Sequence, residues 1–128
     1  MMLRFAAALV LSFGLAGLAV AAAQMSADDE RRAAVTVLRA INTAEHAVMR
    51  QTGKYAPMET LIDHPMMARV KPNITASSGT FRHAEAEVRI SLSPDATQYV
   101  VTVVSGAPTH NAAFSDERGL IYTGRALQ

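Results

Sequence analysis

The residues best suited to metal chemistry in this chain are a histidine and two methionines in one short stretch. His64 is followed by Pro65, Met66 and Met67. Imidazole and thioether groups suit copper(I), so residues 64–67 are a candidate metal site. Methionine pairs also fill irregular gaps in protein cores, and we expect that role here. The histidines do not recur at the i, i+3 or i, i+4 spacing that pairs ligands on one helix face; they are His46, His64, His83 and His110.

A second group near the C-terminus has the residue types of a hydrolase triad: Ser115, Asp116 and His110. The serine is not set in the G-x-S-x-G pattern of a nucleophile elbow, and a hairpin turn does not build an oxyanion hole. The sequence contains no cysteine, which excludes thiolate nucleophiles, thiolate metal sites, disulfides and a lipid-bearing cysteine. We therefore predict no catalytic residues, no metal ligands, no cofactor and no enzymatic activity.

The first 23 residues differ in composition from the rest of the chain. Arg4 supplies a positive end, residues 5–20 form an apolar run, and three alanines precede Gln24. This order is typical of a secretory signal peptide, so we predict one at residues 1–23 and a single domain at 24–128. A retained membrane anchor is the alternative, because the apolar run is near the length that spans a bilayer. We expect a periplasmic or secreted protein in the first case and an inner-membrane-anchored one in the second.

The rest of the chain is formally neutral. The whole sequence has 12 Lys and Arg and 11 Asp and Glu, and removing Arg4 leaves 11 of each sign in residues 24–128. This balance argues against nucleic acid or an anionic lipid surface as the main partner. We expect membrane contact only if the leader is retained.

A long helix is predicted at about residues 27–52. Ser26 and Asp29 have the spacing of a capping box, and Gly53 suits the C-terminal cap. We place Asn42 on the solvated face with the arginines, whose charge Glu45 helps to offset. One apolar stripe recurs at helical spacing, at Ala34, Val37, Leu38, Ile41, Ala44 and Val48.

Two strands and a hairpin are predicted downstream. Prolines break residues 54–78 into a packed loop with a short helical turn at 58–62. Alternating polarity predicts strands at 85–92 and 98–104, followed by a hairpin that turns at residues 116–119 and by a loose tail at 124–128. The predicted fold class is α+β, with one long N-terminal helix packed on a small antiparallel sheet of three to four strands.

The order of these elements resembles that of type IV pilin-like or pseudopilin-like proteins. The resemblance covers about residues 34–122 and rests on 39–45 (RAINTAE), 52–56 (TGKYA) leading to Leu61, 99–101 (YVV), Pro108 and 114–121 (FSDERGLI). It implies a non-catalytic headpiece that acts through contacts with envelope or secretion-apparatus proteins. The N-terminal segment departs from the family. Prepilins are cut after a glycine and carry a glutamate at the fifth residue after the cut, which acts in assembly. Here Gly14 and Leu15 lie within the apolar run, and the fifth residue counted from Leu15 is Ala19. We therefore expect a headpiece exported by an ordinary signal.

Two binding alternatives stay open. Some pseudopilins hold calcium in a C-terminal loop, but Asp116 and Glu117 fall short of the six to eight oxygens that calcium takes, so we expect a solvated turn. The second alternative is a small periplasmic protein that binds a metal or a small molecule with residues 64–67.

Overall fold

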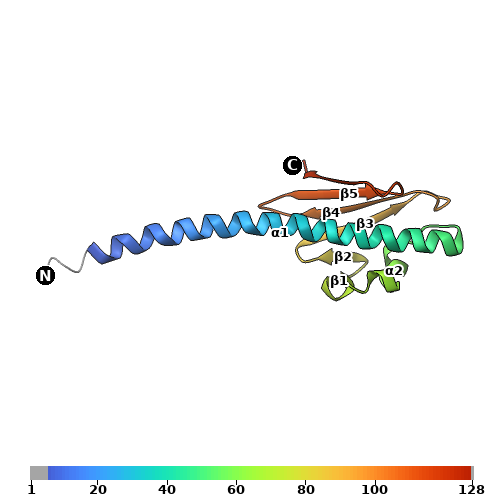
Figure 1. Ribbon diagram of the computed structural model, residues 1–128, viewed down its shortest axis with the longest axis horizontal. Coiled ribbons are helices and arrows are strands. Elements are labelled where there is room, and N and C mark those ends of the chain that lie inside the picture. Colours follow the sequence, from blue (N-terminus) through green and yellow to red (C-terminus); the bar gives the residue numbers. More distant parts are fainter. Residues whose placement is uncertain (1–5, 128) are drawn as a thin grey trace.

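The fold is α+β, with one long N-terminal helix packed on a six-stranded antiparallel sheet, an architecture that is pilin-like (Figure 1). The computed structural model describes the backbone of residues 6–127 and the side chains of residues 27–127. Its helices are α1 (Ala6–Thr52) and α2 (Met58–Leu61), with 3-10 turns η1 (Pro65–Met67) and η2 (Lys71–Asn73). Its strands are β1 (Ile74–Ser77), β2 (Thr80–His83), β3 (Ala86–Leu92), β4 (Tyr99–Ser105), β5 (Asn111–Asp116) and β6 (Ile121–Arg125).

Helix α1 ends where the sequence predicts, but it begins much earlier. Gly53 adopts φ +78° and donates its N–H to Met49 O, which closes the helix after Thr52. The predicted start near Ser26 is wrong, because the helix continues upstream through this residue to Ala6. Alanine and leucine dominate the upstream run and have high helix propensity, so no cap is needed at Ser26. Of the predicted leader at 1–23, residues 1–5 lie outside the described residues and the remainder is described as backbone only.

The sheet lies beside the C-terminal part of α1, and the N-terminal part of the helix projects beyond it (Figure 1). The contact begins near Glu30, whose Oε2 accepts hydrogen bonds from Thr109 Oγ1 and Asn111 Nδ2. Asn111 Nδ2 also donates to Ala27 O at 3.2 Å. Among the residues with described side chains, no stretch of helix is long and apolar enough to cross a membrane.

The six strands lie in sequence order, each antiparallel to the next. The predicted strands at 85–92 and 98–104 are confirmed as β3 and β4, and the predicted hairpin as β5 and β6. The prediction of three to four strands is wrong because β1 and β2 form a further hairpin. Ser78 and Gly79 both have positive φ, the geometry of a two-residue hairpin turn. The tail prediction is wrong at Gly124 and Arg125, which belong to β6.

The core lies between α1 and one face of the sheet. The predicted helix stripe is buried from Ala34 to Ala44, and Val48 is partly buried. On the strands that face it, alternate residues point inward: Val88 on β3, Val101 and Val103 on β4, and Ala113 on β5. The intervening residues form the opposite surface, which we call the outer face.

Candidate interaction surface

Three buried polar side chains, Asn42, Tyr99 and Ser115, connect α1 to strands β4 and β5 through a chain of hydrogen bonds. Tyr99 Oη donates to Asn42 Oδ1 at 2.6 Å, and Asn42 Nδ2 donates to Ser115 Oγ at 2.8 Å. Ser115 Oγ donates in turn to Leu120 O at 2.7 Å. The placement of Asn42 on the solvated helix face is therefore wrong. The Asn42 amide has both an acceptor, which the Tyr99 hydroxyl uses, and a donor, which the Ser115 hydroxyl uses.

Glu45 on α1 was expected on the solvated face and is instead completely buried. Its Oε2 accepts the backbone N–H of Ala56 at 2.8 Å, which fixes the loop after α1 against the helix. Its Oε1 has no hydrogen-bond partner among the described residues. Burial disfavours the charged form and raises the pKa of Glu45 to about 7, although the hydrogen bond from Ala56 acts the other way. The aromatic rings of Tyr55 and Tyr99 stack edge to face beside it, with centroids 4.7 Å apart.

The three residues that have the types of a hydrolase triad, Ser115, Asp116 and His110, are not brought together. Ser115 is fully buried, and its hydroxyl is engaged by Asn42 and Leu120. Asp116 accepts from Arg118, with Oδ2 2.7 Å from Nη2, and this contact lowers the pKa of Asp116. His110 lies at the opposite end of β5, about 16 Å along an extended strand from Ser115. The Ser115 hydroxyl is therefore engaged in structural hydrogen bonds within the helix–sheet interface, away from His110.

The candidate metal loop at 64–67 likewise does not converge. Met67 is completely buried in the core, whereas the neighbouring Met66 is 52% exposed. His64 Nδ1 accepts the backbone N–H of Met66 at 3.1 Å, which caps the 3-10 turn η1. In the part of the chain with described side chains, no group of three or more His, Asp or Glu residues is placed to hold a metal ion. Within this part of the chain, no third carboxylate joins Asp116 and Glu117 to form a calcium site.

The outer face carries an apolar cluster on its β4–β6 half, which we call the aromatic patch: Val100, Phe114 and Tyr122. Phe114 and Tyr122 are direct cross-strand partners, and their rings stack with centroids 4.9 Å apart. Val100 lies diagonally from Phe114 across the β4–β5 pair. All three side chains are more than 40% exposed, at 46%, 47% and 41%. Burying them would remove a substantial apolar area from water, a favourable change on contact with a partner.

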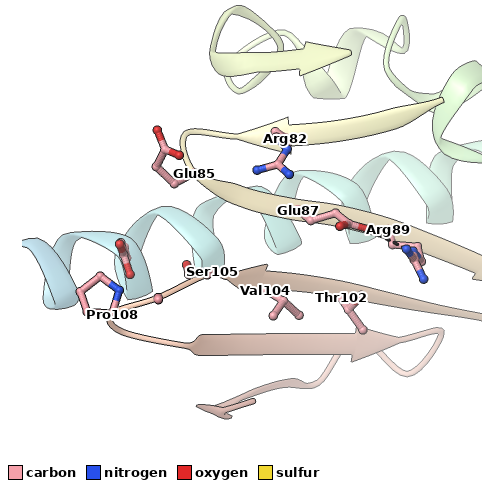
Figure 2. A pocket seen from close by; sticks show the side chains of 11 residues that line it. Arg82, Glu85, Glu87, Arg89, Thr102, Val104, Ser105 and Pro108 are labelled. Carbon is pink, nitrogen blue, oxygen red and sulfur yellow. Dashed lines mark hydrogen bonds and ion pairs between the residues drawn. The ribbon is translucent and has the colours of Figure 1, made fainter. Parts of the chain in front are cut away.

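The β2–β4 half of the outer face is charged and hollowed (Figure 2). The hollow measures about 600 Å³, and Figure 2 shows Arg82, Glu87 and Arg89 on its strands with Thr102 and Val104 beside them. Glu87 Oε1 pairs with Arg89 Nη2 at 2.7 Å. The hollow is broad, its charged side chains are mostly exposed, and positive and negative groups alternate. It offers a polar border to the aromatic patch, as interfaces have at their rims.

The aromatic patch is the surface that sequence reasoning missed. Phe114 and Leu120–Tyr122 signalled a hairpin, but the residues that face outward depend on the register across the turn. The observed register pairs Phe114 with Tyr122 and leaves Ser115 and Ile121 on the helix side. Polar residues usually face solvent and aromatic residues the core, but here Ser115 faces inward and Phe114 outward. The burial of Ser115 is explained by its hydrogen bond with Asn42.

Comparison of the chain with protein-family models, with curated proteins and with solved structures finds no match.

Proposed function

We propose that this chain is a non-catalytic exported protein, related to pilin-like headpieces, that acts through protein–protein contacts made by the aromatic patch. The observation that carries the proposal is the exposed Phe114–Tyr122 stack on a sheet whose other face is already filled by α1. Aromatic residues are enriched in protein interfaces, where they bury large areas at little entropic cost. The neutral charge of residues 24–128 favours an envelope or secretion-apparatus protein over nucleic acid as the partner.

The buried polar groups support the same proposal. Asn42, Tyr99 and Ser115 satisfy one another, and Glu45 holds the loop at Ala56. These contacts stabilise the packing of α1 on the sheet and leave none of the four open to a substrate. The packing of one long N-terminal helix on an antiparallel sheet supports the pilin-like assignment, since the resemblance implies an N-terminal helix followed by a small antiparallel sheet.

A surface variant tests the proposal directly. The double variant Phe114→Ser, Tyr122→Ser removes the exposed stack without touching the core, and Met66→Ser is the control because Met66 is equally exposed on another surface. We expect both variants to melt near the wild-type temperature, and only the double variant to lose its protein partners when isolated from the cell envelope after crosslinking. Partner binding that survives in the double variant contradicts the proposal.

The export part of the proposal has its own test. Mass measurement of the native N-terminus distinguishes cleavage before Gln24, which gives a periplasmic or secreted protein, from an intact start, which gives an inner-membrane-anchored one. We expect cleavage before Gln24. Recovery of the full-length chain in the cytoplasm would contradict export altogether.

A further inference from the structure

Strand β6 forms an open edge of the sheet, and its backbone polarity can be assigned from the register. Ala126 N donates to His110 O, which places this pair at a hydrogen-bonded position of the ladder, and in an antiparallel ladder every second pair along β5 and β6 is then hydrogen-bonded. Tyr122 and Gly124 therefore bond to β5. The N–H and C=O groups of Ile121, Thr123 and Arg125 point away from β5, toward the open side.

This edge lacks the features that usually keep strand edges from pairing. It contains no proline and no lysine, and its one charged residue is Arg125 at the very end. Exposed apolar side chains also gather along it. Of the six large hydrophobic side chains that are exposed among the described residues, four lie on β5, β6 or the segments that flank β6: Phe114, Leu120, Tyr122 and Leu127.

We propose that β6 pairs antiparallel with β6 of a second copy of this chain, about a two-fold axis at Thr123. This register joins Thr123 to its own copy and Ile121 to Arg125 of the partner, so it uses all three outward-facing residues. If the axis shifts by one residue, to Tyr122 or Gly124, the outward-pointing N–H and C=O groups of the two strands still face each other. Part of the β6 edge is then left unpaired. The centred register is therefore the most favourable one.

The side chains of β6 are complementary to themselves in this register. Tyr122 on the outer face lies opposite Gly124 of the partner strand, and nothing lies within 4 Å of the position that a Cβ on Gly124 would occupy. Each tyrosine ring can therefore cover the partner's glycine, an arrangement that stabilises glycine in strands. The two Phe114–Tyr122 stacks then lie diagonally across the axis on the same outer face.

The charges are complementary as well. Arg125 lies on the α1 side of β6, because its register partner Asn111 contacts α1. The β5–β6 turn that carries Glu117 lies beside α1, since a Cβ on Gly119 in this turn would lie 4.0 Å from His46 Nε2. The two-fold axis brings the C-terminal end of one β6 beside the other copy's turn. Arg125 of each copy then approaches Glu117 of the other.

The pairing fixes the direction of the two long helices. Contacts of Ala27 with Asn111 and of Asn42 with Ser115 show that α1 runs parallel to β5. The two-fold axis reverses this direction, so the N-terminal parts of the two helices project to opposite sides of the dimer. Such a pair suits chains that are free of a common membrane. The inference rests on the proposed function, which it extends by naming a second copy as the partner.

A cysteine scan of the full chain tests the pairing, because the natural sequence has no cysteine. A bonded pair across the axis brings its Cα atoms to about 5.5 Å, within the range for a disulfide. Under mild oxidation we expect Thr123→Cys to give mainly a disulfide-linked dimer and Thr75→Cys, on the opposite edge strand β1, to stay monomeric. Equal crosslinking of the two variants contradicts the pairing.

A proline variant provides the second measurement. Thr123→Pro removes an N–H that makes no bond within the sheet, so we expect an unchanged melting temperature at concentrations where the chain is monomeric. The dimer loses two hydrogen bonds by symmetry, which predicts about thirtyfold weaker dimerisation by analytical ultracentrifugation. Unchanged dimerisation contradicts the inference. Suppose that Thr123→Cys crosslinks no better than Thr75→Cys and that Thr123→Pro dimerises like the wild type, while the aromatic patch still captures a different protein. The self-pairing is then wrong and the proposed function stands.

Discussion

Asn42 on α1 and Tyr99 on β4 are joined by a 2.6 Å hydrogen bond inside the helix–sheet interface, 57 residues apart in the chain. Asn42 also donates a hydrogen bond to Ser115 on β5, so a single side-chain amide bonds the helix to two adjacent strands. Because the groups are buried, losing one partner leaves the others without water to replace it. This contact therefore helps to fix the position of α1 on the sheet, together with the apolar core.

Replacing Asn42 by alanine is expected to lower the free energy of unfolding by about 3 kcal/mol, since two buried partners lose a bond. Tyr99→Phe removes one hydroxyl and leaves Asn42 bonded to Ser115, so we expect a loss of about 1 kcal/mol. Urea unfolding of both single variants and the double variant measures the coupling. Strictly additive losses would show that the two side chains do not interact.

Glu45 predicts an unusual dependence of stability on pH. Its pKa is raised from an ordinary value of 4.5 to about 7, so between these values the folded state binds more protons than the unfolded state. Stability is then fully present below about pH 4.5, declines as the pH rises, and has lost up to about 3 kcal/mol above pH 7.

The matched control is Glu45→Gln, which keeps the shape and cannot ionise. Burial lowers the pKa of His83, which acts in the opposite direction because its stability is lost as the pH falls. The difference between the wild type and the glutamine variant isolates Glu45. We expect melting curves of the two proteins to diverge between pH 5 and 8, with the variant more stable at pH 8. Parallel curves would show that Glu45 is not desolvated.

The assignment of helix faces is tested by two charge changes. Ile41 is completely buried, so Ile41→Asp places an unpaired charge in the core and is expected to cost more than about 4 kcal/mol. Arg50 is exposed, and Arg50→Ala is expected to stay within about 0.5 kcal/mol of the wild type. Thermal unfolding measures both. Similar losses in the two variants would contradict the packing of α1.

The neighbouring methionines separate a core role from a metal role. Met67→Ala should destabilise the protein by about 3 kcal/mol through the cavity it leaves, whereas Met66→Ala should have little effect. Copper(I) should leave the melting temperature of the wild type unchanged. A copper(I)-dependent rise that both substitutions abolish would instead support the metal site at residues 64–67.

The sequence predicted the parts of the fold that local patterns determine. The helix stripe from Ala34 to Ala44 and the alternation in β3 specify one dry face each, so their type and burial follow from periodicity. Strand β1 is mostly exposed and has no such alternation, which is why it and β2 were missed. The helix start was misplaced because a local capping signal at Ser26 competes with a strongly helix-forming run before it.

The buried polar residues show why the interface was harder to predict. Asn42 and Glu45 adjoin the stripe residues Ile41 and Ala44, so helical geometry allows them on either face. Their polarity alone favours solvent, and only the partners Tyr99, Ser115 and Ala56 make burial acceptable. Those partners come from distant parts of the chain. Their position cannot be read from spacing along the helix.

The central claim is that the Phe114–Tyr122 face meets another protein, and site-specific photo-crosslinking in living cells tests it most directly. A photoreactive residue at position 114 is compared with one at position 66, since both natural side chains are about half exposed. We expect discrete protein adducts, identifiable by mass spectrometry, at position 114 and not at position 66. Absence of adducts at 114, or the same adducts at both positions, would contradict it.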